Sequence, residues 1–113
     1  MQRDPRAYLW DARRAAELIL GFVEHKDFRE YVASPLLRSG VERQFEIIGE
    51  ALNQLSRVDP DLAASVPDLA ELVGFRNLLI HGYALVDDAI VWEAVTTELP
   101  ALRQRLNELL AEN

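Results

Sequence analysis

The sequence predicts an all-α protein, a small up-and-down bundle of about five helices. Apolar residues recur at i, i+3, i+4 and i+7 through most of the chain, the spacing that places them on one face of an α-helix. The 113 residues include only five glycines and five prolines, and no segment alternates polar and apolar residues as a half-buried strand does. At this length, with 50% hydrophobic residues, we expect residues 1–113 to form a single domain.

Three helices are predicted in the N-terminal half. The first covers about residues 5–24, because Asp4 is a good capping residue and a proline follows it in the first turn. A short helix over 28–33 comes next, and a long one over 35–58 opens with a Ser-Pro pair and is locally weakened by glycines such as Gly49. The stripes that we expect to be buried are Tyr8, Ala12, Ala15, Ile19 and Phe22 in the first helix, and Leu37, Val41, Phe45, Ile48, Leu52 and Leu55 in the third.

Two further helices are predicted in the C-terminal half. The proline- and aspartate-containing segment DPDLAASVPD at residues 59–68 predicts a turn. A helix then restarts near Pro67 and carries GFRNLLIHGY at 74–83. After the loop ALVDD, the last helix covers about residues 88–110. Pro100 removes one backbone donor inside this helix and should kink it. The expected buried stripe of the last helix is Val91, Val95, Leu99, Leu102, Leu106 and Leu109.

Charge and composition argue against several classes of function. The net charge of −7 and the pI of about 4.7 count against a broad basic face for long nucleic acid, but they permit a small site for one phosphate. The chain has no cysteine and only two well-separated histidines, so we expect no disulfide, thiol nucleophile or metal cluster. Neither a membrane span nor a signal peptide is predicted, and we expect a cytoplasmic protein.

Arg76 lies in the middle of an apolar helix face. An ideal helix turns about 100° per residue, and that rotation groups Arg76 with Leu69, Leu72, Val73, Leu79 and Ile80. Burying an unpaired guanidinium costs roughly several kcal/mol. Arg76 therefore needs either a carboxylate partner or a water-filled cleft that opens onto this face.

The same helix is apolar on a second face. Leu78 lies opposite Arg76, so we expect one face to be covered by the bundle and the other by a second subunit. His81 is rotated from Arg76 by about 140°, so one rigid helix cannot direct both side chains at one atom. Either the helix unwinds at Gly82, or the Arg76 and His81 side chains of two copies meet across a dimer axis. On residue chemistry alone, ordinary structural roles for Arg76, His81 and Tyr83 are the favoured interpretation.

The segment Arg76–Tyr83, RNLLIHGY, resembles the R-x4-H-x-Y motif of the HEPN superfamily, and most closely that of its HepT-like branch. The similarity extends over nearly the whole chain, through VERQFEIIGEALN at residues 41–53 and VDDAIVWEAV at 86–95. HepT-like proteins are homodimeric toxins of toxin–antitoxin pairs. Their two motif helices face each other in a cleft, and they act as metal-independent ribonucleases. The resemblance implies a HEPN-like, dimeric fold and an RNA substrate here.

The resemblance also implies which residues form the site. His81 would exchange protons with the ribose 2′-hydroxyl and the leaving 5′-oxygen, and Arg76 would bind the phosphate. Asn77 matches the polar residue that commonly follows the arginine. Glu50 belongs to the family-like GEALN segment and to a ladder of three glutamates at i, i+4 spacing. A solvated face is the favoured interpretation of the ladder, and Glu50 is its first member to test as an anchor for Arg76.

Control by a partner is the last implication of the resemblance. In the family, an MntA-like nucleotidyltransferase antitoxin transfers AMP from ATP to the motif tyrosine, which is Tyr83 here. An AMP group there would bring a negative phosphate beside Arg76 and silence the toxin, as in a type VII-like system. No metal or other cofactor is implied. The alternative is a non-enzymatic helical dimer that binds a nucleotide or docks the nucleotidyltransferase.

Overall fold

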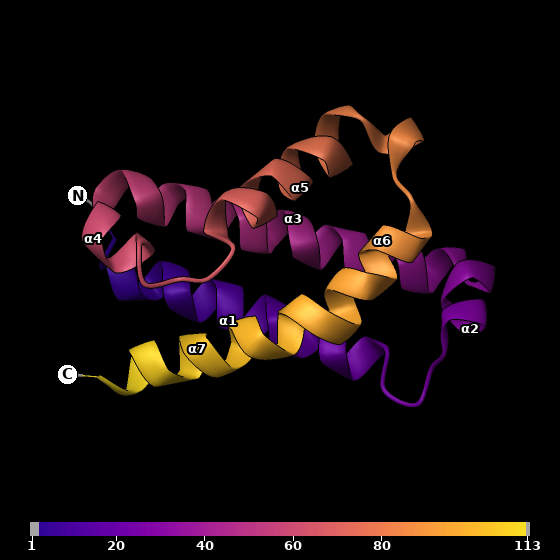
Figure 1. Cartoon of the computed structure of the whole chain (residues 1–113), viewed down its shortest axis with the longest axis horizontal. Coiled ribbons are helices and arrows are strands. Elements are labelled where there is room, and N and C mark those ends of the chain that lie inside the picture. The colour runs from indigo at the N-terminus through magenta and orange to yellow at the C-terminus, as the bar shows by residue number, and fades with distance from the viewer. Residues whose placement is uncertain (1–2, 113) are drawn as a thin grey trace.

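Four long helices run in alternating directions through the molecule (Figure 1). They are α1 (Pro5–Phe22), α3 (Pro35–Val58), α5 (Leu69–His81) and α7 (Leu99–Ala111). The structure, a computed structural model, describes residues 3–112, and no β-strand occurs within them. The predicted all-α, up-and-down fold is confirmed. Within the same residues, no helix is both long enough and apolar enough to cross a membrane.

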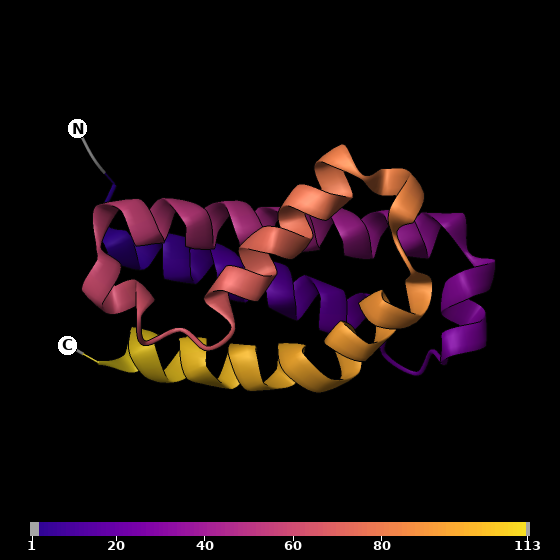
Figure 2. The same ribbon diagram turned by 45° about the horizontal axis from the view of Figure 1, so that its top comes forward.

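Shorter elements connect the long helices. The connecting elements are α2 (Phe28–Ala33), α4 (Pro60–Ala63), the 3-10 turn η1 (Tyr83–Leu85), α6 (Asp88–Glu93) and the π-helical turn η2 (Ala94–Glu98). The α2 helix joins α1 to α3 at one end of the molecule, and α4 reverses the chain at the other end, where both termini lie (Figures 1 and 2). The last predicted helix therefore corresponds to three consecutive elements, α6, η2 and α7.

Side-chain caps are present at the starts of α1 and α3, where the sequence predicted them. Asp4 accepts a hydrogen bond from the Arg6 backbone at 2.9 Å, and the Ser34 hydroxyl accepts one from the Leu37 backbone at 3.1 Å. The predicted bounds of α2 and α3 are confirmed. The α1 helix ends at Phe22 and not near residue 24, because the chain reverses there and His25 adopts a left-handed φ of 64°. The α5 helix begins at residue 69, two residues after the predicted restart.

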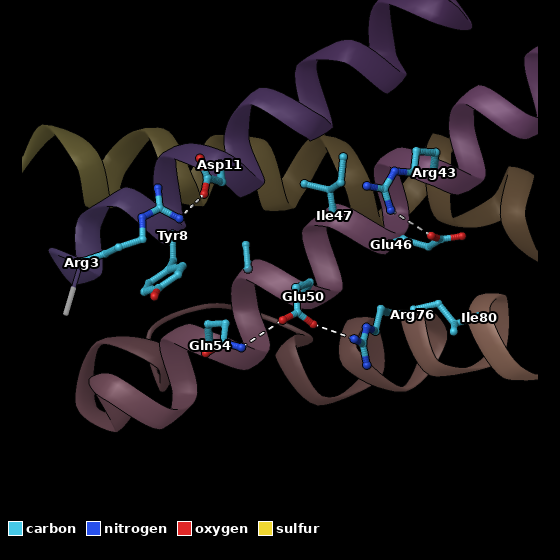
Figure 3. A pocket seen from close by; sticks show the side chains of 11 residues that line it. Arg3, Tyr8, Asp11, Arg43, Glu46, Ile47, Glu50, Gln54, Arg76 and Ile80 are labelled. Carbon is cyan, nitrogen blue, oxygen red and sulfur yellow. Dashed lines mark hydrogen bonds and ion pairs between the residues drawn. The ribbon is translucent and has the colours of Figure 1, made fainter. Parts of the chain in front are cut away.

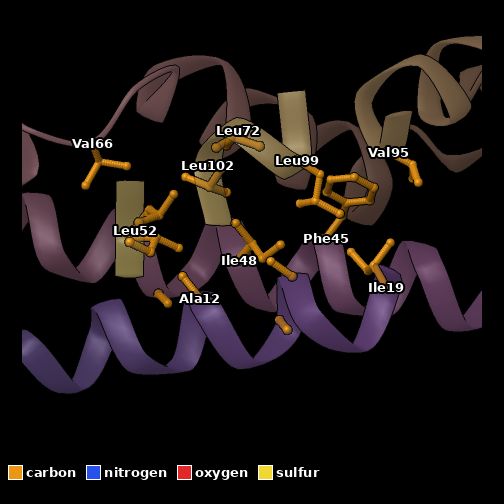
Figure 4. Packing of buried hydrophobic residues seen from close by; sticks show 14 of the residues in the cluster. Ala12, Ile19, Phe45, Ile48, Leu52, Val66, Leu72, Val95, Leu99 and Leu102 are labelled. Carbon is orange, nitrogen blue, oxygen red and sulfur yellow. The ribbon is translucent and has the colours of Figure 1, made fainter. Parts of the chain in front are cut away.

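The hydrophobic core lies between α1, α3 and α7, with Leu72 of α5 closing one side (Figure 4). Most residues of the predicted stripes are buried in it. Phe22 is an exception, with 39% of its surface exposed, because it is the last residue of α1 and its ring lies over Gly40 of α3. Burial of Tyr31 in α2 was not predicted. Its side chain is fully buried and packs against Trp92, with ring centroids 5.4 Å apart.

The interruption expected at Pro100 is present as the π-helical turn η2. Proline has no N–H to donate, and its ring conflicts with the carbonyl four residues earlier, so a regular α-helix cannot pass through it. The wider turn of η2 comes just before α7, in which Pro100 occupies the first turn. The Thr96 hydroxyl donates to the Trp92 carbonyl at 3.0 Å within this turn.

The α5 helix crosses α3 at Gly49 (Figure 2). A Cβ added to Gly49 would lie only 2.8 Å from Cγ of Arg76, closer still to its Cβ, and 3.0 Å from the Leu72 carbonyl oxygen. The sequence predicted Gly49 to be a local weakness of α3. In the folded chain its missing side chain is instead the reason that α5 can approach so closely, and the Phe45 and Phe75 rings pack edge to face nearby, 5.2 Å apart.

We expect Gly49→Ala to destabilise the protein, because the new methyl group would push α5 away from α3. Overpacking of this kind lowers the free energy of unfolding by about 1–3 kcal/mol. Gly21→Ala in α1 is the matched control: no atom lies within 4 Å of its added Cβ, and alanine at an exposed helical position should add about 0.5–1 kcal/mol. Urea unfolding followed by circular dichroism measures both. Equal stability of the two variants would contradict the close contact at Gly49.

Candidate functional site

Arg76 is held by hydrogen bonds to two side chains, of which Figure 3 shows Glu50. Its Nη2 donates to Glu50 Oε2 at 2.7 Å, and its Nη1 donates to Asn77 Oδ1 at 2.8 Å. The other oxygen of Glu50 accepts from Gln54 Nε2 at 2.9 Å. Of the two possibilities that the sequence left for Arg76, the carboxylate partner is therefore present. A purely solvated face was the wrong interpretation for Glu50, because the α5 crossing brings Arg76 onto it.

The pair fixes a guanidinium that remains open to solvent. The Arg76 side chain is 25% exposed and the Glu50 side chain is 44% exposed, so solvent screens their attraction and the pair contributes only about 0–1 kcal/mol. The Nε of Arg76 is buried with no hydrogen-bond partner in the described chain, and the Cβ and Cγ of the same side chain lie against Gly49. A guanidinium has two N–H groups on each terminal nitrogen. Because Glu50 and Asn77 use one each, one donor remains on each terminal nitrogen for a ligand.

A pocket of about 410 Å³ adjoins Arg76 between α1, α3 and α5. Three ion pairs border it: Arg3 with Asp11 at 2.8 Å, Arg43 with Glu46 at 3.2 Å, and Arg76 with Glu50. Figure 3 shows these side chains around the opening. The rest of the lining is Tyr8, Ile47, Ala51, Gln54 and Ile80. The pocket therefore combines paired charges with an apolar surface.

His81 and Tyr83 lie outside this pocket. His81 is the last residue of α5 and is exposed, and helical geometry turns it away from Arg76. Gly82 ends the helix, and its backbone N–H donates to the Leu78 carbonyl at 2.7 Å. The helix does not unwind before His81, so one chain does not bring Arg76 and His81 together. Tyr83 begins η1 and is 78% exposed.

Exposed apolar side chains continue from α5 into α6. They are Leu78, Ile80, Tyr83, Leu85 and Ile90, with 37% to 78% of their surfaces exposed. Exposure of Leu78 agrees with the predicted second apolar face. Ile80, which the sequence groups with the apolar face around Arg76, is 41% exposed, because α3 covers α5 along Leu72 and Leu79 and leaves Ile80 at the rim of the pocket.

The other members of the glutamate ladder have different surroundings. Glu46 pairs with Arg43, whereas Glu42 faces α2 and α6, where burial and the neighbouring Asp88 raise its pKa above the ordinary value. Neither residue contacts Arg76 through a hydrogen bond or ion pair within residues 3–112. In the same range, no three histidine, cysteine, aspartate or glutamate side chains form a group that could hold a metal ion.

Sequence reasoning missed several residues of this site. Gln54 follows Glu50 at i+4 on one helix, so helical spacing could have identified it. Tyr8 and Asp11 reach the pocket from α1, and Arg3 reaches it from just before that helix. No local pattern in the sequence connects the start of the chain with α3 and α5, because that contact depends on how the helices pack.

Known proteins resemble the chain along almost its full length. The Ribonuclease HepT-like family matches residues 12–109. A protein of Caldanaerobacter subterraneus subsp. tengcongensis, provisionally named an RNase, is 33% identical over 108 residues, which cover 96% of each chain. A protein of Thermococcus cleftensis with the name probable ribonuclease HepT is 31% identical over 109 residues, covering 96% of this chain and 98% of its own. No solved structure matches significantly. This chain therefore belongs to the Ribonuclease HepT-like family of the HEPN superfamily.

Proposed function

We propose that this protein is a metal-independent endoribonuclease that acts in the cytoplasm as the toxin of a type VII-like toxin–antitoxin pair. The observation that carries the proposal is the complete RNLLIHGY motif at the end of α5, in a chain whose family relatives bear ribonuclease names. The position of Arg76 supports it, because the side chain is fixed by Glu50 and Asn77 yet keeps free donors.

The proposed reaction uses the RNA's own 2′-hydroxyl as the nucleophile. Neutral His81 removes the 2′-hydroxyl proton, the 2′-oxygen attacks the adjacent phosphorus, and the bond to the 5′-oxygen breaks. The leaving 5′-oxygen takes a proton from the imidazolium that His81 has become, so His81 returns to its neutral form. The products carry a 2′,3′-cyclic phosphate and a 5′-hydroxyl. Arg76 binds the phosphate and stabilises the charge that develops on its oxygens. DNA lacks the 2′-hydroxyl and would not react.

Each complete site requires two copies of the chain in this proposal. The reason is geometric: Arg76 and His81 project from different sides of α5, and only a second copy can bring a His81 to the Arg76 of the first. The exposed Leu78 and Leu85 near the end of α5 offer apolar surface for such a homodimer. Gly74 adds a position with no side chain and no neighbour within 4 Å, where another helix can approach.

Glu50 and Asn77 act as positioning residues for Arg76. A free arginine side chain samples many rotamers, and two hydrogen bonds restrict it to one. The carboxylate also offsets part of the guanidinium charge, so Arg76 binds a phosphate without retaining it strongly after cleavage. These two roles are consistent with the partial exposure of the Arg76 and Glu50 side chains.

Tyr83 is proposed as the site of control. A phenol is a poor base at neutral pH, so the cleavage chemistry does not need Tyr83. Its 78% exposure supports access by a second enzyme. An MntA-like nucleotidyltransferase antitoxin would transfer AMP from ATP to the Tyr83 hydroxyl and release pyrophosphate. The added phosphate would compete with RNA for the Arg76 guanidinium of the shared site.

A non-enzymatic alternative is favoured by two observations. The chain carries a net charge of −7, and Glu50 already occupies part of the guanidinium of Arg76. In this alternative the protein is a helical dimer that binds a nucleotide or docks the nucleotidyltransferase without cutting RNA. Cleavage assays on purified protein separate the two functions.

We expect the purified protein to cleave RNA in the presence of EDTA and to leave 2′,3′-cyclic phosphate ends. His81→Ala and Arg76→Ala should each lower the rate by about 10²–10⁴-fold, the usual effect of removing an acid–base group or an electrostatic stabiliser. His25→Ala and Arg103→Ala are matched controls at exposed positions and should cleave normally. Gel analysis of end-labelled RNA measures the rates. Loss of activity in EDTA, or a fully active His81→Ala, would refute the mechanism.

We expect Tyr83→Phe to keep its ribonuclease activity and to escape silencing. Intact-mass analysis after incubation with the antitoxin and ATP should show added AMP on the wild type and none on Tyr83→Phe. Tyr8→Phe, which removes a partly buried phenol on α1, should still be modified. Equal modification of Tyr83→Phe, or full RNA cleavage by the AMP-bearing wild type, would exclude this role for Tyr83.

A further inference from the structure

We infer that the pocket between α1, α3 and α5 binds one nucleobase of the RNA, next to the phosphate that Arg76 contacts, and thereby selects the nucleotide at the cleavage position. The inference rests on the proposed function for the phosphate at Arg76. It adds a second part to the site, on the side of α5 that carries Arg76 and Ile80. The pocket's charge, size and polar groups each support a base as the ligand.

The charge of the pocket favours a neutral ligand. Its three guanidinium groups are each paired with a carboxylate, at 2.8 Å for Arg3, 3.2 Å for Arg43 and 2.7 Å for Arg76. Three positive and three negative groups leave no net charge, so the pocket does not attract a run of phosphates. The cancelled charges do not weaken the binding of an uncharged nucleobase. Only the phosphate attached to its ribose needs a cation, and Arg76 supplies it.

The size and surface of the pocket suit a planar base. Its volume of about 410 Å³ falls within the roughly 300–1,000 Å³ of small-molecule sites. Ile47 and Ala51 of α3 and Ile80 of α5 line it with apolar atoms that can cover the face of a ring. Proteins read single-stranded RNA by accepting an unstacked base against such a surface and by hydrogen bonding to its edges.

Two polar side chains in the pocket can read the edge of a base. Gln54 uses one N–H of its amide to hold Glu50 at 2.9 Å, which leaves a second N–H and the amide oxygen for a ligand. The Tyr8 hydroxyl is the other candidate. The Arg3 guanidinium lies 4.8 Å from the centre of the Tyr8 ring and fixes the ring from one side. A donor and an acceptor on one amide distinguish bases by their complementary edges.

Binding of nucleoside 3′-monophosphates tests the inference without any cleavage step. Calorimetry on the wild-type protein would compare adenosine, cytidine, guanosine and uridine 3′-monophosphates with inorganic phosphate and with ribose 5-phosphate. We expect at least one nucleotide to bind more tightly than both base-free probes, and the four bases to differ. If all four nucleotides bind no more tightly than ribose 5-phosphate, the pocket does not accept a base.

Gln54→Leu tests which residue reads the base. The substitution keeps most of the volume and removes the amide. Because Gln54 also holds Glu50, inorganic phosphate binding reports any indirect effect through Arg76. We expect the affinity for the preferred nucleotide to fall about fivefold more than the affinity for inorganic phosphate, the usual effect of one hydrogen bond. Gln104→Leu on the exposed surface of α7 is the matched control and should bind like the wild type. Unchanged base preference in Gln54→Leu would overturn the assignment. Because these probes cannot be cleaved, a protein that binds a base but lacks ribonuclease activity refutes the proposed function alone.

Discussion

The contact between the backbone of Gly49 and the stem of Arg76 determines the geometry on which the site depends. A side chain at Gly49 would collide with Arg76 and with the Leu72 carbonyl, so glycine alone lets α5 approach α3 this closely. That approach places the Arg76 guanidinium 2.7 Å from Glu50 and opens the pocket toward α1. It also directs the opposite side of α5 outward, where His81 and Leu78 are exposed. One backbone contact thus fixes the side of α5 on which Arg76 lies, and in the proposed dimer the second subunit brings its His81 to that side.

Helix positions and most of the core could be predicted because they depend on local chemistry. The caps at Asp4 and Ser34 and the repeating apolar stripes act over a few residues, and the α2 and α3 bounds agree with the structure. Phe22 was wrongly predicted to be buried, because its exposure depends on where a neighbouring helix stops covering it. For the same reason, sequence reasoning could propose Glu50 as the anchor of Arg76 but favoured solvent, since the pairing depends on the crossing at Gly49.

An acidic protein can act on RNA if it does not hold the polymer by charge. The ion pairs around the pocket cancel one another, and the chain has a net charge of −7, so long-range attraction to phosphate is weak. In the proposed site, recognition is local: one guanidinium contacts one phosphate and a neutral pocket accepts one base. Such a site also explains why a single AMP group at Tyr83 could silence it, because the modification supplies the same phosphate to the same arginine.

The proposed mechanism requires that Arg76 of one chain and His81 of another form one RNA-cleaving site. Arg76→Ala and His81→Ala chains, coexpressed with different affinity tags and purified through both, form a mixed dimer. In that dimer one shared site carries both substitutions and the other carries neither, so we predict about half of the wild-type cleavage rate, although each variant alone is inactive. A mixed dimer that fails to cleave RNA, or a wild-type protein that forms no dimer, would contradict the shared site.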